Sequence, residues 1–156
     1  MRLTRFTDYS LRVLMLVASD PTRRPTIAEV AAALDVPNNH LTKVVHFLGQ
    51  QGWLSNTRGR GGGIALGASA ERINVGDVVR AAEGEAIPAT CFGALPEPCT
   101  IRRLCRLRSM LAEAVAAFHA VLGGYTLADI VRQPAALTRA VQAPRVKRVA
   151  VHAEPS

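Results

Sequence analysis

Two short amphipathic segments, joined by a three-residue turn, constrain the fold of this chain most. Thr26 and Glu29 have the spacing of a capping box, which predicts a helix over residues 27–34. Residues 35–37 supply the turn, and a second helix is expected over about 38–50. This order is typical of a helix-turn-helix. The apolar residues expected on the inner face of the second helix are Leu41, Val44, Val45 and Leu48.

The turn departs from the common pattern at both ends. Asp35 occupies the position where glycine most easily adopts a left-handed backbone, and aspartate tolerates that conformation better than most residues. Pro37 stands at or next to the N-cap of the second helix, where its side chain cannot accept a capping hydrogen bond. Both are departures of detail, and the helix-turn-helix prediction stands.

A hairpin follows the second helix directly. Residues 53–57 and 64–66 predict two short strands around a tip of glycine and arginine, which gives the element order of a winged helix. From Val36 to Ala70 the chain contains no Asp or Glu, whereas a surface without an anionic partner usually mixes both signs. We therefore expect DNA binding, against the alternative of two hairpins that simply pack. The expected contacts are Asn38, Asn39, His40, Thr42 and Lys43 on the second helix, and Arg58 and Arg60 at the hairpin tip.

The whole pattern predicts a mainly α fold with a small β-hairpin wing, followed by a long dimerisation helix. A first helix is expected from Thr7 or Asp8 to about Ser19, and little order is expected beyond Pro134. The expected domains are a winged helix-turn-helix at 1–82, a cluster-binding loop at 83–99 that contains two cysteines expected to hold a metal cluster, a dimerisation helix with a short C-terminal helix at 100–131, and a disordered basic tail at 132–156.

The basic charge of the chain is unevenly distributed. The net charge is +7, and more than half of the excess falls in residues 132–156. The isoelectric point alone is therefore a weak argument for nucleic acid. For the tail we expect that deletion of residues 138–156 weakens binding to all DNA alike and flattens its salt dependence.

The long helix, expected over about residues 100–122, carries an apolar stripe at spacings of three and four. A stripe of this length beyond a compact DNA-binding unit predicts a dimer seam, and two-fold dimers suit palindromic DNA. The alternative is a helix packed into the core of its own chain. The stripe consists of Leu104, Leu107, Leu111, Val115, Phe118 and Leu122.

Three cysteines, Cys91, Cys99 and Cys105, lie within fifteen residues. An odd number in a chain of 156 residues, long enough to fold without disulfides, makes a poor disulfide framework. No apolar run approaches a membrane span and no signal peptide is predicted, so we expect a cytoplasmic protein without a membrane partner. In that compartment clustered cysteines indicate metal binding or catalysis.

The cysteine spacing leaves three interpretations open. It matches neither a zinc ribbon nor a ferredoxin run, but three thiolates can hold an iron–sulfur cluster and leave one iron to another ligand. A zinc site completed by His or Asp and a set of incidental thiols are the alternatives. A cysteine-based redox enzyme would need a CxxC pair or a nearby base, and neither is present, so we do not expect an enzyme.

Taken together, these features resemble the NsrR-type repressors, nitric-oxide sensors in the winged-helix iron–sulfur regulator family that also includes IscR. The resemblance covers about residues 1–131 and is specific only as a set of motifs. It rests on the three cysteines and on the stretches Met1-Arg2-Leu3-Thr4-Arg5-Phe6-Thr7-Asp8-Tyr9, Arg58-Gly59-Arg60-Gly61-Gly62-Gly63, Asn74-Val75-Gly76-Asp77-Val78-Val79, Cys105-Arg106-Leu107 and Tyr125-Thr126-Leu127-Ala128-Asp129.

The resemblance implies a homodimer whose three cysteines hold a [4Fe–4S] cluster, with Asp8 of the partner subunit as fourth ligand. From the residues alone, Asp8 would be a helix N-cap. Arg12, one turn later, is placed to pair with Asp8, and Glu85 is a candidate neighbour of the ligands.

The implied function is repression at a palindromic operator by the loaded dimer, and release when nitric oxide attacks the cluster. Genes of nitric-oxide detoxification are among the family's targets. A cluster-status or redox-sensing regulator resembling IscR is the alternative in the same fold. It ranks lower because IscR-type proteins have closer cysteines and a downstream His ligand, whereas the nearest downstream His here is His119.

Overall fold

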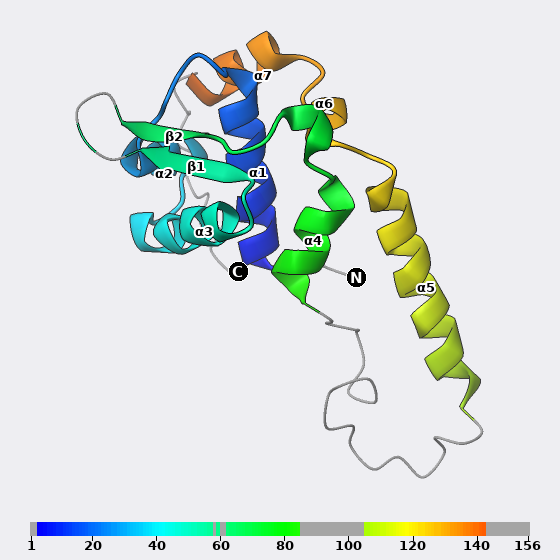
Figure 1. Cartoon of the computed structure of the whole chain (residues 1–156). Helices are drawn as coiled ribbons and strands as arrows, with labels where there is room; N and C mark the ends of the chain where they lie inside the picture. The colour runs from blue at the N-terminus through cyan, green and yellow to red at the C-terminus, as the bar shows by residue number, and fades with distance from the viewer. Residues whose placement is uncertain (1–2, 58, 60–61, 85–104, 143–156) are drawn as a thin grey trace, which may run out of the picture.

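The computed structural model describes residues 3–57, 59, 62–84 and 105–142. These residues form a mainly helical fold with one two-stranded antiparallel sheet, as the sequence predicted (Figure 1). No helix in the described ranges is long and apolar enough to cross a membrane. The elements are α1 (Arg5–Ser19), α2 (Ile27–Leu34), α3 (Asn38–Gln50), β1 (Leu54–Thr57), β2 (Gly63–Leu66), the 3-10 turn η1 (Ala70–Arg72), α4 (Val75–Glu83), α5 (Arg106–Gly123), α6 (Leu127–Ile130) and α7 (Pro134–Gln142).

The helix-turn-helix forms where the local signals place it. The hydroxyl of Thr26 accepts from the backbone N–H of Glu29 at 3.2 Å, and the Glu29 carboxylate accepts from the Thr26 N–H at 2.7 Å. Asp35 adopts the left-handed conformation, with φ of 56°, and its N–H donates to the last carbonyls of α2. Pro37 is the N-cap of α3 and provides no side-chain hydrogen bond. Both departures in the turn are therefore confirmed.

The wing, residues 54–66, is a hairpin whose strands pair from Leu54 with Leu66 to Thr57 with Gly63. Its root lies against the segment that precedes α2. The N–H of Ile64 donates to the carbonyl of Pro25 at 2.8 Å, and a Cβ on Gly63 would lie 2.3 Å from the carbonyl oxygen of Arg24. The wing is thereby held at a defined position beside α3.

The core surrounds α1, which runs through the middle of the molecule and packs against α2, α3, α4 and α7 (Figure 1). Val13, Leu14 and Val17 of α1 are buried. The four inner residues predicted for α3 are all buried as well, which confirms the helical period on which the prediction rests. Burial of these side chains fixes α3 against α1, so the opposite face of α3 remains in solvent.

The start of α1 was predicted wrongly. The helix begins at Arg5, because Thr4 is the N-cap and its hydroxyl accepts from the N–H of Thr7 at 3.3 Å. Thr7, one of the two expected caps, is fully buried, and Asp8 lies within the first turn. The earlier start follows from a contact that is distant in sequence, since Thr4 also donates to Glu83.

The start of α5 and the end of the chain also differ from expectation. Cys105 has an extended backbone and is the N-cap of α5, so the described helix begins at Arg106 rather than near residue 100. Beyond Pro134, where little order was expected, residues 134–142 form α7. Proline suits the first position of a helix, and Leu137 packs against the core as α7 meets α1 and α2.

The apolar stripe of α5 is divided. Its members Leu111, Val115, Phe118 and Leu122 are half-buried on a helix that packs against α4. Leu107 is 59% exposed, and Met110 in the next turn and Val121 near the C-terminal end of α5 are exposed as well. Leu104 lies outside the described residues.

The C-terminal end of α5 is joined to the start of α4 by main-chain contact. A Cβ on Gly76 would lie 2.7 Å from the backbone nitrogen of Gly123. The side-chain amide of Asn74 donates to the carbonyl of Gly123 at 2.8 Å, and the N–H of Val75 donates to the carbonyl of Tyr125 at 2.9 Å. These contacts fix the C-terminal end of α5 relative to the start of α4.

Candidate nucleic-acid interface and metal site

The first two turns of α3 present polar side chains to solvent. The five DNA contacts predicted on this helix are all exposed. Leu41, which stands between them in the sequence, points into the core and is buried. The Thr42 hydroxyl donates to the carbonyl of Asn38 at 2.9 Å, and the Asn39 side chain accepts from the N–H of His40 at 2.9 Å. Within the described ranges Lys43 has no carboxylate partner. This face therefore carries hydrogen-bonding groups and a free cation, as a nucleic-acid contact requires.

The predicted wing-tip residues, Arg58 and Arg60, lie outside the described residues. Sequence reasoning missed another arginine at the wing root, Arg24, whose Nη1 lies 3.4 Å from the hydroxyl of Thr57. Its neighbour Arg23 pairs instead with Glu29 at 2.8 Å. No local pattern could have found Arg24, because its position depends on the packing of the wing against the segment before α2.

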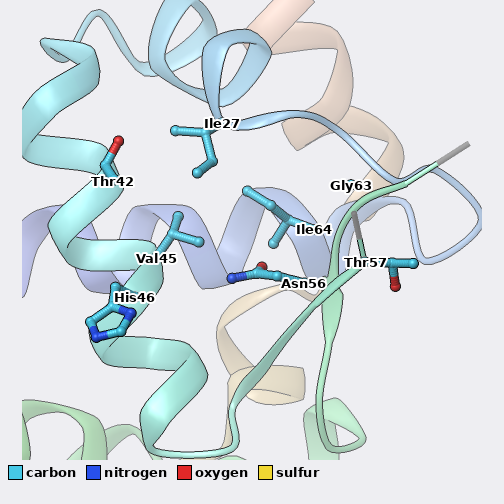
Figure 2. A pocket seen from close by; sticks show the side chains of 8 residues that line it. All are labelled: Ile27, Thr42, Val45, His46, Asn56, Thr57, Gly63 and Ile64. Atoms are coloured by element: carbon cyan, nitrogen blue, oxygen red, sulfur yellow. The ribbon is translucent and has the colours of Figure 1, made fainter. Parts of the chain in front are cut away.

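His46 is the second histidine of α3. The side chain is exposed and is among the residues that line a crevice between α3 and the two strands (Figure 2). His46 follows Thr42 by four residues and Lys43 by three, so helical spacing alone places it on the same exposed face. The crevice has a volume of about 300 Å³ and also contains Asn56 of β1 in its lining.

At the other end of α1, Asp8 and Arg12 form the ion pair that the sequence predicted. The Arg12 Nε lies 2.9 Å from Asp8 Oδ1, and both side chains are about half exposed. Cys105 is partly exposed, and it makes no side-chain capping bond to α5. The N-terminal ends of α1 and α5 and the C-terminal end of α4 lie at the same end of the molecule (Figure 1). Asp8 and Cys105 therefore belong to one end of the fold.

Two further predicted ligands and the predicted neighbour Glu85 belong to the segment that precedes α5. Cys91, Cys99 and Glu85 lie outside the described residues, and within those residues no three His, Cys, Asp or Glu side chains converge. His119 lies fourteen residues beyond Cys105 on α5, which separates the two by about 21 Å along the helix axis. A site at Cys105 therefore has no access to His119 of the same chain.

The family model described as an iron-dependent transcriptional regulator, Rrf2, matches residues 3–133. The chain is 45% identical over 133 residues to the HTH-type transcriptional regulator NsrR of Bacillus subtilis, covering 85% of this chain and 91% of that protein. It is 41% identical over 138 residues to the NsrR of Geobacillus kaustophilus, covering 88% of this chain and 94% of that protein. The chain belongs to the Rrf2 family.

Solved structures agree with this Rrf2 assignment at the level of the fold. The T. potens IscR structure matches with a TM-score of 0.66 at 20% identity, over 85% of this chain and 87% of that one. CymR, described as the global cysteine regulator of B. subtilis, matches with a TM-score of 0.64 at 23% identity, over 85% and 97%. These relatives and neighbours are regulators, so this Rrf2 protein is a transcriptional regulator of the NsrR type rather than a cysteine-based enzyme.

The start of α2 in this Rrf2 regulator is held by a carboxylate that stays ionised. Hydrogen bonds from the N–H and hydroxyl of Thr26, with a further bond from Arg23, lower the pKa of Glu29 to about 2. At neutral pH the capping box is therefore fully formed. Since α2 packs against α3, the box helps to fix the angle at which α3 presents its polar face.

Proposed function

We propose that this Rrf2 regulator is a repressor that binds a palindromic DNA operator as a homodimer and is released by nitric oxide. The observation that carries the DNA-binding part is the acid-free, exposed face of α3 beside the wing. Asparagine and lysine on the first turns of a recognition helix suit base edges and phosphates. We assign the DNA contacts to Asn38, Asn39, His40, Thr42 and Lys43, with Arg58 and Arg60 of the wing tip.

The dimer part rests on α5. Leu107, Met110 and Val121 are exposed and fall on one side of the helix, next to the half-buried stripe that packs toward α4. Met110 follows Leu107 by three residues and Val121 follows Met110 by eleven, so the three side chains form an exposed apolar band along one side of the helix that a second α5 can cover. Two-fold pairing through this band would present two copies of α3 to a palindromic site.

The control part rests on the end of the molecule that carries Asp8 and Cys105. We assign Cys91, Cys99 and Cys105, with Asp8 of the partner subunit, as ligands of a [4Fe–4S] cluster. The described residues fit this role: the Cys105 thiol stands at the positive end of α5, which favours an anionic centre, and Arg12 orients the Asp8 carboxylate. A bound cluster would supply iron that can react with nitric oxide, and the Asp8 carboxylate of the partner subunit would hold one iron in place of a thiolate.

The route from Asp8 to the DNA face lies within α1. Asp8 occupies the first turn of α1, and α1 packs directly against α3. A change in what holds Asp8 therefore acts on the helix that supports the recognition helix. Such small shifts of packed helices are a known means of switching.

The test is the visible spectrum of protein purified without oxygen, with iron and sulfide assays followed by nitric-oxide titration. We expect a broad band near roughly 400 nm that bleaches with nitric oxide while affinity for the operator falls in parallel. Asp8→Asn should change the rate of bleaching and leave the folded protein intact. Asp77→Asn is the matched control, because Asp77 pairs with Arg80 at 3.0 Å on α4 in a similar ion pair.

Two results would contradict the proposal. A colourless protein that binds DNA equally well with zinc or with no metal would refute the assignment of an iron–sulfur cluster. A loaded protein whose DNA affinity ignores nitric oxide but follows cluster content would leave the alternative of a cluster-status regulator.

A further inference from the structure

The crevice between α3 and the wing has walls of mixed chemistry. Ile27, Val45 and Ile64 form its floor, while Thr42 and His46 stand on the α3 side and Asn56 on the strand side (Figure 2). Its volume is about 300 Å³, and it is open to solvent on the exposed face of α3. No function described so far uses its polar groups other than Thr42.

Two polar side chains that line the crevice make no hydrogen bond within the described ranges. Among the residues that the structure describes, no hydrogen bond engages the side-chain amide of Asn56 or the imidazole of His46. Figure 2 shows the Asn56 amide extending from β1 toward α3. Two polar side chains without a hydrogen-bond partner that line one crevice are available to a ligand.

The charge of the crevice favours an anion. None of the residues that line it is acidic. Its rim includes Thr57, whose hydroxyl oxygen accepts a hydrogen bond from Arg24 Nη1 at 3.4 Å. Arg24 has no carboxylate partner in the described part of the chain, whereas the nearby Glu29 is occupied by Arg23. The crevice therefore combines neutral donors with one available cation.

The geometry of duplex DNA identifies an occupant. With α3 in the major groove, as the proposed DNA binding requires, a wing that stands beside α3 lies across the sugar–phosphate backbone that borders this groove. Whatever lies between α3 and the wing must therefore face this backbone. Asparagine, threonine and arginine side chains are common donors to phosphate oxygens.

We propose that this crevice seats one sugar–phosphate backbone of the bound duplex, with His46 and Asn56 donating hydrogen bonds to it and Arg24 neutralising a phosphate at the wing root. The inference rests on the proposed DNA binding. These contacts carry no sequence information, so they set the register of α3 in the groove and add equal affinity for every sequence.

The test compares His46→Ala, Asn56→Ala and Arg24→Ala in the full-length protein prepared without oxygen. The probes are a duplex of random sequence and the duplex that wild-type protein enriches from a random pool. Ser55→Ala and Gln50→Ala are matched controls, because these exposed residues belong to the same strand and helix but do not line the crevice. All five positions are exposed, so the fold should survive each change, which circular dichroism checks.

We expect the first three variants to bind both duplexes more weakly by about tenfold, and the two controls to bind like wild type. Arg24→Ala should reduce the slope of log affinity against log salt by about one, whereas Asn56→Ala should leave it unchanged because no charge is lost. A methylphosphonate at the contacted phosphate should lower the DNA affinity of the wild-type protein. It should lower the affinity of the Asn56→Ala protein much less, because that variant has already lost the hydrogen bond to this phosphate. This non-additivity would identify the partner.

The outcomes separate the two proposals. Wild-type protein that binds DNA, with all three variants binding equally well, would overturn the crevice inference and leave the proposed function standing. Wild-type protein that binds neither duplex would overturn both. A loss confined to the enriched duplex would show base contact rather than backbone contact and would also contradict the inference.

Discussion

Glu83 accepts two hydrogen bonds from Thr4, which lies 79 residues earlier in the chain. Its Oε1 lies 2.7 Å from the Thr4 backbone nitrogen and 3.1 Å from the Thr4 hydroxyl. The same hydroxyl caps α1. The last residue of α4 therefore holds the first turn of α1, where Asp8 stands, next to the point at which the cysteine-bearing segment leaves α4.

Replacement of Glu83 by Ala should loosen the first turn of α1. Loss of the two bonds removes about 1 kcal/mol of stability at a partly exposed site. Hydrogen exchange should quicken at the Asp8 amide and remain unchanged in α3. Glu71→Ala is the control, because Glu71 is exposed and makes no hydrogen bond in the described ranges. Equal protection of Asp8 in both variants would show that the contact does not hold the helix.

Gly76→Ala should destabilise the protein, whereas Gly123→Ala should not. The added Cβ at Gly76 would lie 2.7 Å from a backbone nitrogen that cannot move aside, and such overpacking costs about 1–3 kcal/mol. A Cβ at Gly123 meets nothing within 4 Å, so the better helix propensity of alanine should make that change neutral or favourable. Urea denaturation of the two variants measures the difference, and equal midpoints would refute the prediction.

The capping carboxylate of α2 should contribute to acid sensitivity. Because the folded-state pKa of Glu29 is lowered from 4.5 to about 2, its contribution is complete above pH 4.5 and is lost as the pH falls toward 2. Glu29→Gln should therefore lower the melting temperature at pH 6 and flatten its fall between pH 4.5 and 2. Melting curves across this range test the sign. A mutant curve parallel to the wild-type curve would argue against the ionised cap.

A charge on the exposed band of α5 should separate the proposed dimer. Met110 is 61% exposed, and glutamate there would place a charge within the band that the partner covers. Ala116→Glu is the control, because Ala116 is exposed on the opposite side of the helix. Sedimentation should show monomers for the first variant at concentrations where the second remains dimeric. Dimers in both would place the seam elsewhere.

Truncation after Gln142 should weaken binding to all DNA sequences and reduce the salt dependence. Residues 143–156 contain Arg145, Lys147 and Arg148 and only one acidic residue. Truncation before Thr138, the deletion considered from the sequence, would divide α7 and is a poorer test. Titrations at several salt concentrations measure the slope. A loss restricted to the operator would indicate a specific role for the tail.

The helix-turn-helix was predictable because its signals are local. Thr26 and Glu29 form the capping box within the first turn of α2. Asp35 ends α2 with its own left-handed backbone, and its N–H donates to carbonyls of the last turn. The cap of α1 was not predictable, since Thr4 is chosen by its bond to Glu83 across the fold. The start of α7 has a proline signal, but its stability depends on packing against α1 and α2.

The candidate site divides in the same way. Helical spacing predicted the exposed residues of α3, and sequence proximity predicted the pair of Asp8 and Arg12. Arg24 was invisible because only the tertiary contact between Ile64 and Pro25 brings its segment to the wing. The cysteine ligands and the wing-tip arginines remain predictions.

The contact between Gly76 and Gly123 has a consequence for the length of the operator. In a homodimer that meets along α5, this contact sets the angle between the pairing helix and the rest of each subunit. A small change in that angle displaces α3 by an amount that increases with its distance from the contact, so it alters the separation of the two recognition helices. Two-fold sites require these to lie about 34–36 Å apart, one turn of the duplex or a multiple of it. The spacing of operator half-sites would thus depend on two glycines that touch no DNA.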